Sequence, residues 1–89
     1  MSNFMRQFLG LPEQTLSEVR EQCRKLMAVE TMASLRHDWK DQIQDLDVCE
    51  RTGLCEPDET WTQAMARLVG QGAPMCDLDT LTTAFRKDT

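Results

Sequence analysis

The 89-residue sequence has few of the large apolar side chains that build a protein core. Leu, Ile, Val and Phe together make up about 20 % of the chain, close to the level at which highly charged chains fail to fold. No apolar run approaches the roughly 20 residues of a membrane span. We therefore expect one small domain over residues 1–89, with a thin core and no transmembrane segment.

The beginning of the sequence lacks the pattern of a secretory signal. Residues 1–11 contain one Arg and no apolar run of the roughly 7–15 residues that precede a signal cleavage site. We therefore expect a cytoplasmic protein.

Residues that favour β-strands are also scarce. Tyr is absent, and Val and Ile are far outnumbered by Leu and Met, which retain rotamer freedom in helices. Apolar residues recur at helical spacing in three stretches, namely Leu16, Val19, Cys23 and Leu26; Met32, Leu35, Trp39, Ile43 and Leu46; and Trp61, Ala64, Met65 and Leu68. The sequence predicts an all-α protein, as a small helical bundle or a long helical hairpin of three to five helices.

Neither Gly nor Pro occurs in residues 13–52, which makes this stretch the longest predicted helical region. One continuous helix of forty residues would be about 60 Å long, too long for a compact monomer of this size. We expect a break near residues 30–34, with Ser34 as the new N-cap. The alternative is an unbroken helix that is covered by a second copy of the chain, so that dimerisation completes the fold.

The end of this long region has a clear stop signal. Gly53 suits the left-handed C′ position of a Schellman cap and Leu54 its apolar C″ position, so the helix should end near Arg51 or Thr52. Pro57 suits the first position of a new helix, which we place at residues 57–69.

Shorter helices are predicted at both ends of the chain. Asp77 is a candidate N-cap for a helix over residues 77–86. Residues 1–10 form a short amphipathic segment that Gly10 interrupts, and Pro12 is a candidate start for the helix that follows. We expect this N-terminal segment to pack on the bundle; docking on a partner or on a membrane surface are the alternatives.

Negative charge is concentrated in the middle of the chain. Residues 38–59 carry eight of the 15 acidic residues, whereas Lys40 and Arg51 are the only basic residues there. Direct binding of nucleic acid requires a stripe of basic residues, and the sequence has none. We therefore expect no direct nucleic-acid binding.

The sequence has few groups that could perform chemistry. His37 is the only histidine, so a nucleophile paired with a histidine base has one candidate base. The four cysteines, Cys23, Cys49, Cys55 and Cys76, lack the close spacing of structural zinc sites. We expect no enzyme, no cofactor and no metal. A metal or redox module that uses Cys49 and Cys55, with Cys23 or Cys76, is the alternative from another class.

Protein binding is the function that these patterns favour. We expect an adaptor, assembly factor or regulator that docks on a larger protein through apolar helix faces and an acidic surface. A homodimer is the other expected assembly. An acidic inhibitor that imitates nucleic acid in the basic groove of an enzyme is an alternative. The candidate partner-binding residues are Asp38, Asp41, Asp45, Asp47, Trp39 and Trp61.

Overall fold

The protein is a small bundle of helices. The computed structural model describes residue 6 and residues 8–85. In this part of the chain the helices are Leu16–Val29 (α2), Ala33–Arg51 (α3), Trp61–Gly70 (α4) and Met75–Phe85 (α5), and there is no β-strand. The predicted all-α fold class is confirmed.

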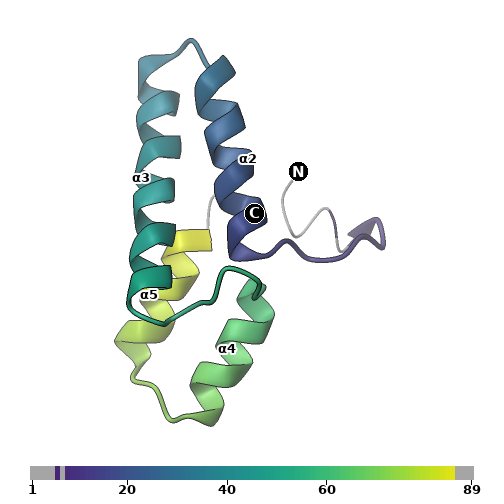
Figure 1. Ribbon diagram of the computed structural model, residues 1–89, viewed down its shortest axis with the longest axis vertical. Helices are drawn as coiled ribbons and strands as arrows, with labels where there is room; N and C mark the ends of the chain where they lie inside the picture. Colours follow the sequence, from purple (N-terminus) through teal and green to yellow (C-terminus); the bar gives the residue numbers. More distant parts are fainter. Residues whose placement is uncertain (1–5, 7, 86–89) are drawn as a thin grey trace.

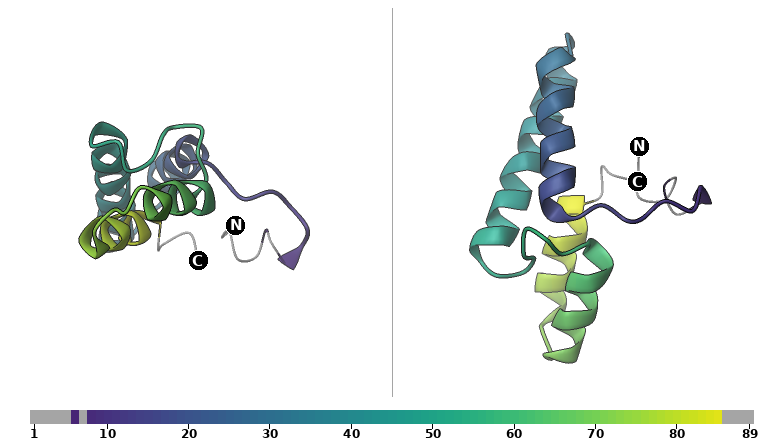
Figure 2. Two further views of the ribbon diagram at one scale, coloured as in Figure 1. Left: turned by 90° about the horizontal axis from the view of Figure 1, so that it is seen from below. Right: turned by 45° about the vertical axis from the view of Figure 1, so that its right-hand side comes forward.

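The four helices form two helical hairpins that point in opposite directions. Helices α2 and α3 make the long hairpin, and α4 and α5 make the short one (Figure 1). Helix α5 packs against both α3 and α4 and so joins the two hairpins. The resulting molecule is elongated, with extents of 42 × 29 × 18 Å (Figure 2).

The long Gly- and Pro-free stretch is divided between two helices. Helix α2 ends at Val29 and α3 begins at Ala33, so the chain leaves the helix inside the interval 30–34. The predicted cap was wrong, because the N-cap is Met32, which makes no side-chain cap bond. The Glu30 carboxylate instead accepts hydrogen bonds from the Thr31 and Met32 amides, each at 3.0 Å.

The end of α3 follows the predicted Schellman pattern. The Leu54 amide donates to Cys49 O at 2.9 Å, and the amide of Gly53, whose φ is +77°, donates to Glu50 O at 3.3 Å. Helix α4 begins at Trp61, not at Pro57, because residues 57 and 58 form a turn and Thr60 is the N-cap.

The N-termini of α2 and α4 meet side by side and cap each other. Thr15 and Thr60, the two N-caps, form an antiparallel β-bridge. The Leu16 amide donates to Glu59 O at 2.9 Å, and the Thr62 amide donates to a Glu13 carboxylate oxygen at 3.3 Å. These bonds satisfy amides that a helix N-terminus leaves without an intrahelical partner.

Two further helix starts differ from the sequence prediction. Helix α2 begins at Leu16 rather than near Pro12, because Thr15 provides the cap. Helix α5 begins at Met75, so Asp77 lies in its first turn rather than at its cap, with its amide donating to Pro74 O at 3.0 Å. Of the amphipathic segment 1–10, residues 1–5 and 7 lie outside the described residues, as do residue 86 of the expected C-terminal helix and residues 87–89.

The core lies where the two hairpins join. Its fully buried members include Leu16 and Val19 of α2, Leu46 of α3 and Leu81 of α5. Trp39, Ile43, Trp61, Met65, Ala73 and Leu78 pack around them partly buried. The buried residues of α2 end at Cys23 and those of α3 begin at Gln42, so all of them lie toward the end of the hairpin that is nearer to α4 and α5.

Candidate docking surface

The part of the long hairpin that lies beyond Cys23 and before Gln42 has no buried residue. Between Arg24 and Asp41 every side chain is at least partly exposed. Three apolar side chains there are widely exposed, Val29 at 75 %, Met32 at 58 % and Leu35 at 37 %. We call these three residues the tip patch. Helices α4 and α5 pack at the other end of the hairpin and do not cover it (Figure 1).

The charges around the tip patch are basic. From residue 24 to residue 40, the exposed charged side chains are Arg24, Lys25, Arg36, Lys40 and, when protonated, His37. The two acidic residues in this range, Glu30 and Asp38, are only partly exposed. The sequence predicted apolar helix faces and an acidic surface, and in the structure the apolar tip lies apart from most of the acidic residues.

Two of the candidate aspartates lie exposed on α3 below the tip. Asp41 is exposed and lies 3.5 Å from His37 Nε2. Asp45 is also exposed and lines a shallow groove of about 260 Å³ between α3 and α5. The opposite side of this groove contributes a further carboxylate, Asp79, which extends the acidic surface onto α5 and which sequence reasoning missed.

Asp47 forms an ion pair with Arg20 of the same chain. Its Oδ1 lies 2.8 Å from Arg20 Nη1, and the same nitrogen lies 2.7 Å from Glu50 Oε1. Arg20 has only 15 % of its side chain exposed, so this ion pair ties α2 to α3. Asp47 therefore has a structural role in the hairpin, although 47 % of its side chain is exposed, close to the 51 % of Asp41.

The two candidate tryptophans pack against the core. Trp61 is partly buried, and its Nε1 donates to Thr82 Oγ1 at 3.3 Å. Trp39 is also partly buried, and its Nε1 is buried without a hydrogen-bond partner in the described part of the chain. Trp39 lies on α3 between the core and the tip patch, so it is the tryptophan nearer to the uncovered surface.

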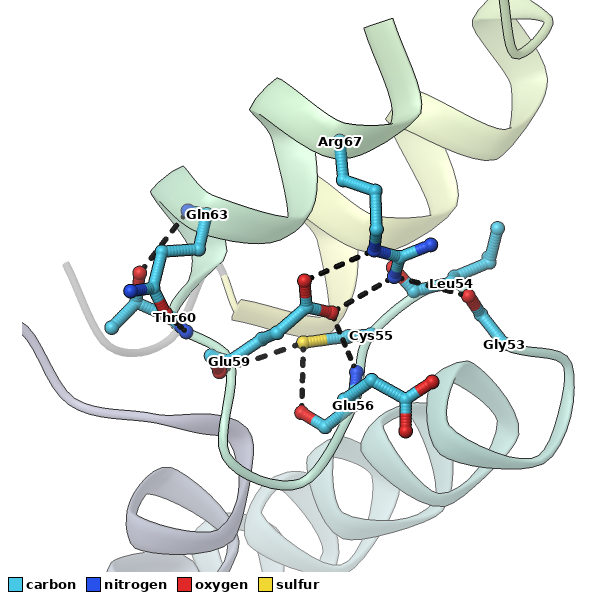
Figure 3. A network of polar contacts seen from close by, with 8 residues as sticks. All are labelled: Gly53, Leu54, Cys55, Glu56, Glu59, Thr60, Gln63 and Arg67. Atoms are coloured by element: carbon cyan, nitrogen blue, oxygen red, sulfur yellow. Dashed lines mark hydrogen bonds and ion pairs between the residues drawn. The ribbon is translucent and has the colours of Figure 1, made fainter. Parts of the chain in front are cut away.

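A polar network that sequence reasoning missed holds the α3–α4 loop (Figure 3). Arg67 donates to both carboxylate oxygens of Glu59, at 3.0 and 2.8 Å, and to Gly53 O and Leu54 O, each at 3.2 Å. The hydrogen bond from Arg67 holds the pKa of Glu59 below its usual value. The network fixes the loop that caps α2, so its role is structural.

Three of the four cysteines are buried thiols. Cys23, Cys49 and Cys55 are buried, and Cys76 is exposed. Burial raises the pKa of Cys49 to about 11 and that of Cys55 to about 12, so both stay protonated at neutral pH. Within the described residues, no three His, Cys, Asp or Glu side chains are grouped so that they could hold a metal ion.

A second exposed apolar surface lies in the segment before α2. Phe8 is 78 % exposed, Leu9 54 % and Leu11 42 %. The segment leaves the base of α2 sideways (Figure 1). An open cleft of about 530 Å³ separates it from α2, with Arg6 on one side and residues from Gln14 to Lys25 on the other.

Comparison with known proteins gives no relative. No family model matches the chain, and neither the curated proteins nor the solved structures include a significant match. Among the described helices, none is long and apolar enough to cross a membrane.

Proposed function

We propose that this protein is a non-catalytic adaptor, assembly factor or regulator that docks on a larger protein through the tip of its α2–α3 hairpin. The uncovered tip patch carries the proposal. Its apolar side chains are exposed at the end of the hairpin, and burying them against a partner would give about 25 cal/mol per Å² of apolar surface. A cytoplasmic location is part of the proposal.

The charges divide the docking surface into two zones. Arg24, Lys25 and Arg36 are exposed within a few residues of the tip patch in the sequence, with Arg24 3.7 Å from Glu21 Oε2; these basic groups favour acidic groups at the rim of the partner's apolar site. Asp41 and Asp45 favour a basic partner region further along α3. A partner that meets both zones would be held in one orientation, because the reversed orientation would place like charges together.

The two alternative functions have weaker support. An inhibitor that imitates nucleic acid needs its carboxylates free, yet Asp47, Glu50 and Glu59 bind arginines of the same chain. A thiol-based metal or redox module needs thiolates, and the raised pKa values of Cys49 and Cys55 disfavour them. Competition by added DNA or RNA tests the inhibitor, and thiol labelling with elemental analysis tests the cysteine-based module.

Affinity capture with matched variants tests the proposal. The tagged protein is used as bait in a host lysate, alongside the tip variant Val29→Glu/Met32→Glu. The control is Val69→Glu/Met75→Glu, which places the same charges at residues of 60 % and 69 % exposure beside the α4–α5 turn, at the far end of the molecule. We expect a protein that the wild type and the control capture and that the tip variant loses at least tenfold, or about 1.4 kcal/mol.

Three outcomes would count against tip docking. Equal capture by all three baits would show that the tip does not contact the partner. Loss with the control variant alone would move the docking surface to the α4–α5 turn. Competition by added DNA or RNA would favour the inhibitor. Circular dichroism of each bait shows whether the helical content is intact.

A further inference from the structure

We propose that one apolar face of the α4–α5 hairpin is a dimer interface, which binds the same face of a second copy of this chain. Five apolar side chains of the two helices form this face, namely Trp61, Met65, Val69, Met75 and Leu78. Val69 is 60 % exposed and Met75 69 %, and the other three are partly buried. We call these five residues the hairpin face.

Helical spacing places these residues on adjoining sides of the two helices. The three residues of α4 follow one another at steps of four, so they share one side of that helix. On α5, Met75, Leu78 and Thr82 follow at steps of three and four and also share a side. Trp61 Nε1 donates to Thr82 Oγ1 at 3.3 Å, so the two sides meet. The hairpin face is therefore one apolar surface that runs along both helices.

The α4–α5 hairpin carries little charge. Residues 60–85 contain three charged side chains, Arg67, Asp77 and Asp79, of which only Asp79 is exposed. Asp79 lies one turn after Met75 and lines the groove between α5 and α3. The tip patch, in contrast, has several exposed basic residues close to it in the sequence. The hairpin face therefore combines exposed apolar side chains with a nearly uncharged surrounding.

A surface of this kind fits a second copy of itself. A two-fold dimer joins the same patch of both chains, so charges of one sign within the patch are brought together. This repulsion disfavours self-pairing of the tip patch and is small at the hairpin face. The buried centres of protein interfaces are also depleted of charged residues and enriched in aromatic residues and Met. Trp61, Met65 and Met75 give the hairpin face this composition.

The size of the hairpin face predicts a weak dimer. Helix α4 has 10 residues and is therefore about 15 Å long. Interfaces that bury less than about 1,200 Å² belong to weak and transient complexes. We therefore expect the two chains to separate on dilution.

Dimerisation through the hairpin face leaves the tip patch free. The α4–α5 turn and the tip lie at opposite ends of the molecule (Figure 1 and Figure 2). A dimer would therefore present two tips, and a partner with two sites would bind it more tightly than it binds the monomer. Only this consequence rests on the proposed function, because the dimer itself requires no other protein.

The mass of the protein in solution, measured over a range of concentrations, tests the dimer. Sedimentation equilibrium gives the dissociation constant of the wild type, of Val69→Glu/Met75→Glu and of the tip variant Val29→Glu/Met32→Glu, which is the matched control. We expect the wild type to show an equilibrium between monomer and dimer. Val69→Glu/Met75→Glu should raise the dissociation constant at least tenfold, because it brings four carboxylates together. The tip variant should dimerise as the wild type does.

Opposite charges should restore the contact. Val69→Lys/Met75→Lys is expected to be monomeric alone, for the same reason as the Glu variant. A tag on the Glu variant should retain the untagged Lys variant at least tenfold better than it retains the untagged Glu variant. A substitution that only disrupted the fold would give no such recovery, and circular dichroism checks the helical content of each variant.

The other outcomes contradict the dimer. A wild type that stays monomeric up to about 1 mM would show that the hairpin face does not pair at any useful affinity. Loss of dimerisation in the tip variant alone would move the interface to the tip. A mass that grows beyond that of a dimer would indicate head-to-tail contact between two different surfaces. No retention of a folded Lys variant by a folded Glu variant would show that the hairpin face does not meet itself.

The capture experiment described above is independent of these measurements. A captured protein that only Val69→Glu/Met75→Glu loses would assign the hairpin face to that protein instead of a second copy. Capture that fails altogether leaves the solution mass valid, and a monomeric wild type leaves capture by the tip valid.

Discussion

Gln42 Nε2 donates a hydrogen bond to the main-chain oxygen of Ala84 at 3.0 Å, across 42 residues of sequence. This bond joins the middle of α3 to the last turn of α5, where helix carbonyls lack intrahelical partners. The oxygen of the same side-chain amide, Gln42 Oε1, accepts a hydrogen bond from Cys23 Sγ of α2 at 3.3 Å. One buried side chain, 3 % exposed, therefore links three helices at the point where the two hairpins join.

Replacing this amide tests its contribution to stability. We expect Gln42→Leu to lower the free energy of unfolding by about 1–3 kcal/mol, because the buried Ala84 carbonyl loses its donor. The control is Gln44→Leu, an exposed position on the same helix, which should change stability by no more than about 0.5 kcal/mol. Urea denaturation followed by circular dichroism measures both. Equal effects of the two variants would contradict the role assigned to Gln42.

The ion pair between Glu59 and Arg67 predicts a dependence of stability on pH. The pKa of Glu59 is lowered in the folded protein by the hydrogen bond from Arg67, so the folded state binds this proton less tightly than the unfolded state does. The stabilisation is complete above the ordinary glutamate pKa of about 4.3 and is lost as the pH falls through the lowered value. Glu59→Gln should therefore be less stable than the wild type at pH 7 and lose this difference in acid.

Denaturation at a series of pH values checks the prediction. The matched control is Glu56→Gln, which removes an exposed carboxylate of the same loop and should differ from the wild type by about 0.5 kcal/mol or less at each pH. A constant difference between Glu59→Gln and the wild type down to pH 2 would show that the ion pair does not control this part of the pH profile.

Thiol labelling distinguishes the buried cysteines from the exposed one. At pH 7.5 we expect a maleimide to modify Cys76 rapidly and the other three thiols about 100-fold more slowly, because they react only when the structure opens locally. Mass spectrometry counts the labels, and labelling in guanidinium should give four. Rapid labelling of two or more thiols in the folded protein, or bound zinc by elemental analysis, would favour the cysteine-based alternative.

Local sequence patterns were sufficient to predict the helical class and the end of α3, and they favoured a break near residues 30–34 while leaving an unbroken helix open. These features depend on local patterns, such as a Gly followed by Leu54 at the end of an amphipathic stretch. The predicted helix starts were less accurate, because Ser34 and Asp77 are plausible N-caps and Pro57 is a plausible first helical residue on propensity alone. Two Thr-x-x-Glu/Gln capping boxes, at Thr15 and Thr60, were the missed sequence signal for the starts of α2 and α4.

The arrangement of the candidate surface could not be predicted from the sequence. Asp41, Asp45 and Asp47 lie close together in the sequence, yet Asp47 pairs with Arg20, which is 27 residues away. Likewise, no local sequence pattern indicates that the α2–α3 hairpin extends beyond the part against which α4 and α5 pack. Such features depend on how far one helix overlaps another, which the periodicity of a single helix does not specify.

Charge reversal on α3 tests whether the acidic zone takes part in docking. We expect Asp41→Lys/Asp45→Lys to keep the helical content of the wild type and to bind the captured partner about tenfold more weakly at 50 mM salt, with a smaller difference at 0.5 M salt because of screening. Asp58→Lys, which reverses an exposed charge in the α3–α4 loop, is the control and should bind as the wild type does. Unchanged affinity of the double variant at low salt would limit the docking surface to the tip patch and its basic rim. A loss that is the same at both salt concentrations would indicate a lost direct contact instead of long-range attraction.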